Sequence, residues 1–327
     1  MKYLPQLTPA QKLLYRKIVF ILAAGFCLTD WASPPVALML GILLALTHEN
    51  PFHRISRPAS KYLLEASVIM LGFGMNLAVV LTAGASGALF AIGSISATFM
   101  LGYFLGKWLK IPIKASALIS AGTAICGGSA IAAVSSVINA AESEISVAMG
   151  TVFVLNAVAL FVFPPLGHLL HLSQTQFGTW AGIAIHDISS VVGAASHYGQ
   201  SALYTATAVK LSRALWIVPI SAAASYIFQH QHTKSGETVA HKPQVPWFIG
   251  LFLLASIART FIPHIVTWSP VIERISEAGL TLTLFLIGAG LSQRMLKAVG
   301  WKPMLQGVVL WIFISATSLG VIMLVVR

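Results

Sequence analysis

An octapeptide rich in small residues, Gly122-Thr-Ala-Ile-Cys-Gly-Gly-Ser129, lies in the middle of an apolar run that extends from 113 to 139. Glycine costs about 1 kcal/mol relative to alanine in a helix interior, so the three glycines in this octapeptide predict an interrupted helix. A related octapeptide, Gly182-Ile-Ala-Ile-His-Asp-Ile-Ser189, occurs 60 residues later inside a second apolar run from 176 to 197. Two interrupted apolar segments are therefore predicted at the centre of the fold.

The composition places these segments in a membrane. Among the 327 residues, 57% are hydrophobic and 9% are charged, and the mean hydropathy is +0.84. Soluble globular domains carry about 25% charged residues, which excludes that class of protein. Because a membrane-spanning helix needs about 20 apolar residues, we predict an all-α polytopic membrane protein with about eleven membrane segments in one domain, 1–327. The predicted segments are 17–30, 34–48, 59–80, 84–106, 113–139, 144–166, 176–197, 203–228, 246–263, 271–292 and 302–326.

The basic residues predict the orientation in the membrane. They concentrate in every second loop, whereas the alternate loops at 31–33, 81–84 and 167–175 contain no Lys or Arg. The positive-inside rule then places the N-terminus in the cytoplasm and the C-terminus outside. These loops also account for the net charge of +11, so no nucleic-acid partner is expected. The basic positions are Lys2, Lys12, Arg16, Lys17, Arg54, Arg57, Lys61, Lys107, Lys110, Lys114, Arg294, Lys297 and Lys302, with Lys234 and Lys242 in the hydrophilic stretch 229–245.

The segments repeat in a permuted order. The first repeat is 34–166 and the second is 176–326, preceded by an extra N-terminal helix at 17–30. Glu65 and the residues after it match Glu277 and the residues after it, and the two octapeptides match each other. All pairs of units become inverted if the two interrupted segments are re-entrant hairpins whose halves meet near the midplane. Discontinuous helices that cross the membrane are the alternative.

The first interruption predicts an anion site. A half-helix that begins near Gly128 directs its N–H groups and the positive end of its dipole toward the interruption. Cys126, Gly127, Gly128 and Ser129 are therefore predicted to contact a small anionic substrate. Close helix packing by small residues is the alternative.

The second interruption contains ionisable side chains. A charge near the bilayer centre costs about 3 kcal/mol or more, so His186 and Asp187 are predicted to serve as coupling or gating groups. Ser189 and Ser190 would offer hydroxyls to the substrate at the start of the second half-helix. The alternative is that this stretch is the exposed end of a helix. Asn156 is a further intramembrane polar residue, usable as a substrate contact or as a bond between helices.

Two cations lie deep in the segment 203–228. Lys210 and Arg213 share one helix face, and Asp187 can offset only one of them. The surplus positive charge predicts that a substrate anion completes the site. Snorkelling of both side chains to the membrane interface is the alternative.

Two glutamates lie at equivalent depth in the two repeats. Glu65 and Glu277 are predicted coupling groups for a proton or Na⁺, as paired carboxylates in inverted repeats would suit. An interfacial position, or local pairing with Lys61 and Arg274, is the alternative.

Three motifs in this order resemble one family. The strings are GTAICGGSAIAA at 122–133, IHDISSVVGA at 185–194 and VKLSRALWIVP at 209–219. They resemble the YeiH-like bacterial inner-membrane proteins, usually labelled sulfate exporters and grouped with the bile acid, arsenite and riboflavin transporter superfamily. The likeness extends over nearly the whole chain. The family pattern carries over to Gly122, Cys126, Gly127, His186, Asp187, Val192, Gly193, Lys210 and Arg213.

The resemblance implies a core domain with broken helices that moves against a panel domain, with the site where the broken helices cross. In that superfamily the broken helices cross the membrane fully, which competes with re-entrant hairpins. The second family motif often has Ala-Gln where this chain has Ser189-Ser190, so the substrate preference can differ. The resemblance also implies the bacterial inner membrane as location.

The residues and the resemblance together predict a secondary transporter that moves a small anion, such as a sulfur oxyanion or sulfonate, by alternating access. A passive anion channel is one alternative. An intramembrane enzyme with Cys126 as nucleophile and His186 as base is another. The two cysteines, Cys27 and Cys126, exclude a disulfide scaffold and a cysteine metal cluster, and no catalytic activity, metal or cofactor is expected. The substrate, coupling ion and oligomeric state, including a homo-oligomer, stay open.

Overall fold

The computed structural model describes residues 8–29, 31–47, 50–232, 247–290 and 299–326, and every regular element within these ranges is an α-helix. The helices are α1 (Pro9–Phe26), α2 (Pro34–Thr47), α3 (His53–Gly72), α4 (Leu77–Leu109), α5 (Ile113–Ala124), α6 (Gly128–Val137), α7 (Glu142–Leu169), α8 (Gln174–Ala184), α9 (Ile188–Tyr198), α10 (Gln200–Ala214), α11 (Ile217–His232), α12 (Trp247–Phe261), α13 (Pro263–Gly290) and α15 (Trp301–Val325). Lys2, Lys234, Lys242, Arg294 and Lys297, used above for orientation, lie outside the described residues.

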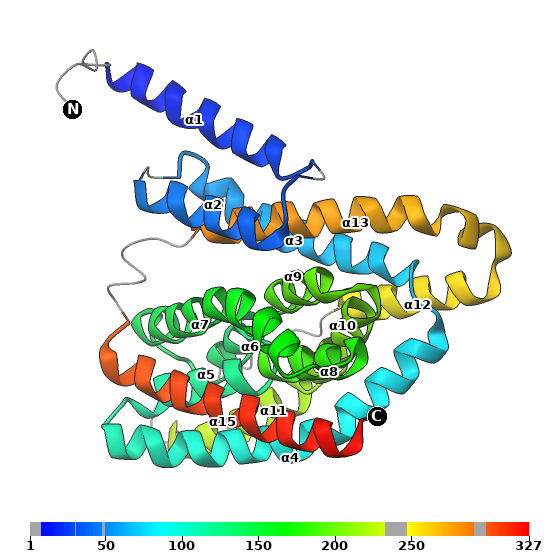
Figure 1. The fold of residues 1–327 in the computed structure, drawn as a ribbon. Helices are drawn as coiled ribbons and strands as arrows, with labels where there is room; N and C mark the ends of the chain where they lie inside the picture. The colour runs from blue at the N-terminus through cyan, green and yellow to red at the C-terminus, as the bar shows by residue number, and fades with distance from the viewer. Residues whose placement is uncertain (1–7, 30, 48–49, 233–246, 291–298, 327) are drawn as a thin grey trace.

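The helices form two layers (Figure 1). The panel layer consists of α1, α2, α3, α12 and α13, and the core layer consists of α4 to α11 and α15. Helices α2, α3 and α13 pack closely together, while α9 is the core helix that reaches both α2 and α13. The chain thus builds part of the panel layer, then most of the core layer, then the rest of the panel layer, and ends in the core layer with α15.

Small residues bring the helix backbones close together within each layer. In the panel layer, a Cβ atom placed on Gly288 of α13 would lie 3.0 Å from the backbone nitrogen of Ile42 in α2. In the core layer, a Cβ on Gly182 of α8 would lie 2.9 Å from the carbonyl oxygen of Ala206 in α10. Close backbone approach at glycine is the usual way in which membrane helices gain packing contacts, because lipid supplies no hydrophobic drive for their association.

The helices are those of a multi-pass membrane protein. Four helical stretches among the described residues are long and apolar enough to cross a membrane, and a fifth qualifies if one bent pair counts as a single span. The bent pair, Pro58–Gly72 with Leu77–Ala85, turns by 114° at its break. The four stretches are Phe90–Leu109, Glu142–Leu169, Gln200–Phe228 and Trp301–Val325.

Three predicted boundaries are wrong. The first helix begins at Pro9 rather than at 17, because Thr8 and Gln11 form a capping box at its start. The third and fourth segments separate after Gly72 rather than at 81–84, because the Asn76 side chain caps α4 by accepting a 2.8 Å hydrogen bond from the Ala78 N–H. The stretch between 263 and 271 is helical, since α13 begins with a proline, which is well tolerated at the first helical position.

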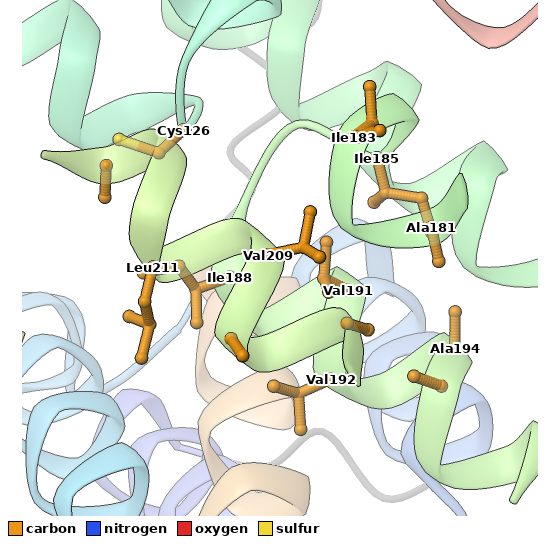
Figure 2. Close-up of a cluster of buried hydrophobic side chains, with 14 of the residues drawn as sticks. Cys126, Ala181, Ile183, Ile185, Ile188, Val191, Val192, Ala194, Val209 and Leu211 are labelled. Carbon is orange, nitrogen blue, oxygen red and sulfur yellow. The ribbon is translucent and has the colours of Figure 1, made fainter. Parts of the chain in front are cut away.

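Both predicted interruptions are present. Helix α5 ends at Ala124 and α6 begins at Gly128, while α8 ends at Ala184 and α9 begins at Ile188. A buried apolar cluster surrounds both breaks, and Figure 2 shows Ile185 and Ile188 on either side of the second one, with Val209 of α10 nearby. The cluster holds the broken segments against α10.

Candidate functional site

The two helix breaks touch each other. Gly127, in the first break, has a φ of 68° and a ψ of −128°, a conformation that is easy only for glycine. A Cβ atom on Gly127 would lie 3.1 Å from the Cβ and 3.4 Å from the backbone nitrogen of Asp187, in the second break. Glycine is therefore required at 127 both for its backbone conformation and for the contact.

A side chain from α7 accepts hydrogen bonds from the backbone of the second break. The Oδ1 atom of Asn156 accepts hydrogen bonds from the backbone N–H groups of His186, at 3.0 Å, and Asp187, at 3.3 Å. These N–H groups would otherwise be unsatisfied in a buried position. Asn156 was expected to contact substrate or to bond helices, and the structure gives it the second role. The sequence signal was present, because a buried asparagine in an apolar helix needs a partner.

The N-terminus of α9 is capped by the chain itself. Asp187 Oδ1 accepts a 2.6 Å hydrogen bond from the Ser190 N–H, which makes Asp187 the N-cap residue of α9. The carboxylate therefore occupies the position where an external anion would bind to this helix end. Ser190 is buried beside it and does not line the cavity described below, whereas Ser189 does.

The carbonyl end of α5 faces two buried cations. Lys210 Nζ donates a 3.3 Å hydrogen bond to the Ile125 carbonyl, and Arg213 donates to the Ala124 carbonyl and, at 2.9 Å, to Ser94 Oγ. Both cations are fully buried. The end of a helix that presents free carbonyls carries partial negative charge and is stabilised by cations. The hydrogen-bond partners of both cations are thus in the protein, and neither Lys210 nor Arg213 lines the cavity described below.

The place where the two helix breaks touch is called the crossing below. A cavity of about 350 Å³ lies beside it, between the two layers. We call it the Glu65 cavity. It contains six of the predicted site residues, namely Glu65, Cys126, Gly128, Ser129, Asp187 and Ser189. The rest of its lining is Ser60, Lys61, Leu64, Ala132, Ala133, Met149, Phe153, Ile188, Ile217, Trp247, Phe248 and Ile287.

The start of α6 is open toward this cavity. Its N-cap residue, Gly127, has no side chain to cap it, the Cys126 thiol lies against the Ala130 N–H, and the first backbone hydrogen bond runs from the Ile131 N–H to the Gly127 carbonyl at 3.1 Å. Gly128 and Ser129, whose N–H groups precede that bond, line the cavity. Uncapped N–H groups at a helix N-terminus are an anion-binding arrangement.

His186 lies behind the crossing rather than in the Glu65 cavity. Its side chain is 1% exposed, and neither ring nitrogen makes a hydrogen bond of good geometry with the described residues, although the Val152 carbonyl is near. The imidazole therefore makes no hydrogen bond to Cys126.

A second cavity, of about 280 Å³, lies farther along α9. We call it the Glu277 cavity, since Glu277 and Arg274 of α13 line it together with Ser196 and His197 of α9. On the side of this cavity nearer the Glu65 cavity, Gly193 and Leu284 line it and α9 packs tightly, because a Cβ atom on Gly193 would lie 2.8 Å from Leu284 Cδ1 and 2.9 Å from Leu160 Cδ1. A third and larger cavity of about 730 Å³, lined by α4, α5, α6 and α11, contains none of the predicted site residues.

Relatives of the chain are bacterial membrane proteins. The chain matches the family model described as Conserved hypothetical protein 698 over residues 13–307. A UPF0324 membrane protein of Bacteroides thetaiotaomicron is 49% identical over 294 residues, which are 89% of this chain and 87% of the relative. A UPF0324 membrane protein of Bdellovibrio bacteriovorus is 48% identical over 309 residues, 94% of each chain. No solved structure matches the chain.

Proposed function

Because the chain belongs to the Conserved hypothetical protein 698 family, which includes the YeiH-like UPF0324 membrane proteins, we propose that it is a secondary transporter of a small anion. One observation carries this proposal: the uncapped N-terminus of α6 opens onto a cavity between two helix layers, at the crossing of two helix breaks. A sulfur oxyanion or sulfonate would bind the N–H groups of Gly128 and Ser129, beside the Cys126 thiol. Lys210 and Arg213 would not touch the anion but would add positive potential from the far side of the α5 carbonyls to which they donate.

The proposal includes an inverted repeat in the membrane. Two contacts support it, because each joins residues that the repeat makes equivalent. Gly127 touches Asp187, 60 positions later, and Ser67 of α3 meets Gly279 of α13, 212 positions later. A two-fold axis exchanges equivalent residues, so two equivalent residues can touch each other only next to the axis. Both contacts are therefore consistent with a pseudo-two-fold axis that passes beside them.

Alternating access would use the two cavities in turn. Glu65 and Glu277, the equivalent glutamates of α3 and α13, line cavities that meet different ends of α9. We propose that the core layer slides against the panel layer and opens one cavity at a time, with about eleven segments in the bacterial inner membrane and a cytoplasmic N-terminus. Glu65, Glu277, Asp187 and His186 would be the coupling or gating groups, with a proton or Na⁺ as coupling ion.

The function is tested with purified protein in proteoliposomes. We expect saturable uptake of radiolabelled sulfate or ethanesulfonate that accelerates when the same anion is loaded inside. Ser129→Pro removes one N–H in the first turn of α6, where proline is tolerated, and should weaken anion uptake by about tenfold, since a hydrogen bond to a charged group contributes about 1.5–3 kcal/mol. Ser129→Ala keeps the N–H and should transport normally. Flux that does not saturate would indicate a channel, and no flux of any tested anion would contradict the proposal.

A larger residue at 193 should block the exchange between cavities. Gly193→Leu places atoms against Leu284 and Leu160, so α9 can no longer slide along α13. We expect transport to slow by roughly tenfold or more, because each 1.4 kcal/mol added to a barrier is a factor of ten, while thermal shifts still report anion binding. Gly250→Leu in α12, where nothing lies within 4 Å of the new Cβ, is the control. Unchanged transport in Gly193→Leu would argue against sliding along α9.

A further inference from the structure

The Glu65 cavity has two chemically different sides. The core layer supplies hydrogen-bond donors, the N–H groups of Gly128 and Ser129 at the uncapped start of α6. The panel layer supplies an acceptor, the carboxylate of Glu65, which is 7% exposed. Its Oε2 atom is buried and has no hydrogen-bond partner among the described residues. A ligand that filled the cavity would meet donors on one side and an acceptor on the other.

The charges on the described lining do not suit an anion alone. Lys61 contributes one positive charge, and Glu65 and Asp187 contribute one negative charge each, which gives a net charge of −1. The two buried cations behind the crossing donate to neutral α5 carbonyls, so their positive charges still act on Asp187 and Cys126. An anion at α6 would nevertheless face the Glu65 carboxylate across the cavity, and like charges repel strongly where water is scarce. A positive charge on the ligand, placed at Glu65, would remove this repulsion.

Lys61 does not donate a hydrogen bond to the buried Oε2 atom of Glu65. It lies one turn before Glu65 on α3 and interacts with its carboxylate, but its own side chain is exposed while Oε2 is buried. A buried carboxylate oxygen without a donor is costly. A donor carried by the ligand would remove this cost, and a charged donor would remove more of it.

We propose that the transported solute is a small zwitterion, with its acidic group on the N–H groups of Gly128 and Ser129 and its ammonium group on Glu65. This rests on the proposed function, and the ammonium group takes the place that a separate coupling ion would have at Glu65. A bound zwitterion spans both layers, so it joins the panel to the core only when the cavity is full. Its net charge is zero, which also lowers the electrostatic cost of carrying it through the bilayer.

The test compares matched solutes on the purified full chain by thermal shift and calorimetry. The first pair is 2-aminoethanesulfonate and 2-hydroxyethanesulfonate, and the second is 3-aminopropanoate and 3-hydroxypropanoate. In each pair only the ammonium group is replaced by a hydroxyl. We expect the amine of at least one pair to bind about tenfold or more tightly than its hydroxyl analogue, as a charge-assisted hydrogen bond to a buried carboxylate would give. Glu65→Gln should remove this preference, whereas Glu142→Gln, at the exposed start of α7 and outside both cavities, should keep it.

The outcomes separate this inference from the proposed function. If each amine and its hydroxyl analogue bind equally, or if the analogue gains equal affinity when Na⁺ or acid is added, a separate cation or none is used, and the zwitterion is wrong while anion transport stands. If neither pair nor sulfate binds, both proposals fail. The comparison on the unmodified chain is decisive even if Glu65→Gln does not fold.

Discussion

Gly127→Ala is expected to destabilise the protein severely and to abolish ligand binding. Position 127 has a positive φ, and holding a non-glycine residue in such a region costs about 1–3 kcal/mol. The new methyl group would also lie 3.1 Å from the Cβ of Asp187, which is tighter than ordinary van der Waals contact. Relief of that contact must move Asp187 or the start of α6, and both are parts of the cavity. The melting temperature in detergent and the thermal shift given by anions measure the two effects.

Gly93→Ala in α4 is the matched control. Nothing lies within 4 Å of the Cβ that it adds, and the position is helical. Replacing glycine by alanine in a helix interior should be neutral or stabilising by up to about 1 kcal/mol. A Gly127→Ala protein with unchanged melting temperature and unchanged ligand response would show that the two breaks do not meet as described.

Arg213→Met is the second change with a large expected effect. The guanidinium donates to the buried Ala124 carbonyl and to the Oγ atom of the half-buried Ser94. Its loss leaves the Ala124 carbonyl without this donor, although Lys210 still bonds the Ile125 carbonyl, and an unsatisfied buried group costs about 1–3 kcal/mol. We therefore expect the ligand-free protein to unfold at a clearly lower temperature. Arg213→Lys should recover part of the loss, because it keeps the charge with fewer hydrogen bonds.

The ligand-free state distinguishes this role from direct anion binding. If Arg213 held the anion, Arg213→Met would leave the melting temperature of the free protein near normal and would remove only the shift caused by ligand. The structure predicts the reverse order of effects. Lys107→Met, which removes an exposed cation from the end of α4, should change neither quantity.

The sequence predicted the helical class, the membrane setting and both interruptions, because these depend on composition and on glycine content within short stretches. The boundaries that failed depend on capping. Asn76 ends the third segment early because its side chain bonds the next helix, and hydropathy does not register such a bond. The helix from Pro263 onward likewise follows from backbone preferences rather than from the apolar pattern.

The sequence predicted which residues lie at the site, but it did not predict which groups those residues contact. Six predicted residues line one cavity, since the repeat placed the two octapeptides together. What a buried group contacts depends on packing between distant helices, which spacing does not give. Thus Lys210 and Arg213 were expected to bind an anion, yet they bond backbone carbonyls. Ser190 was expected to contact the substrate, yet its N–H bonds the Asp187 carboxylate.

The order of the layers along the chain also constrains how the protein is made. Helix α3 ends at Gly72, and its partner α13 begins at Pro263, after the whole sequence from α4 to α12. At about 5–20 residues per second, synthesis of the intervening chain takes about 10–40 s. During that time α3 must wait in the bilayer without its partner while α4 to α11 are inserted. We therefore expect the panel layer to close late during biogenesis, after α4 to α11 have been inserted and before α15 completes the core layer.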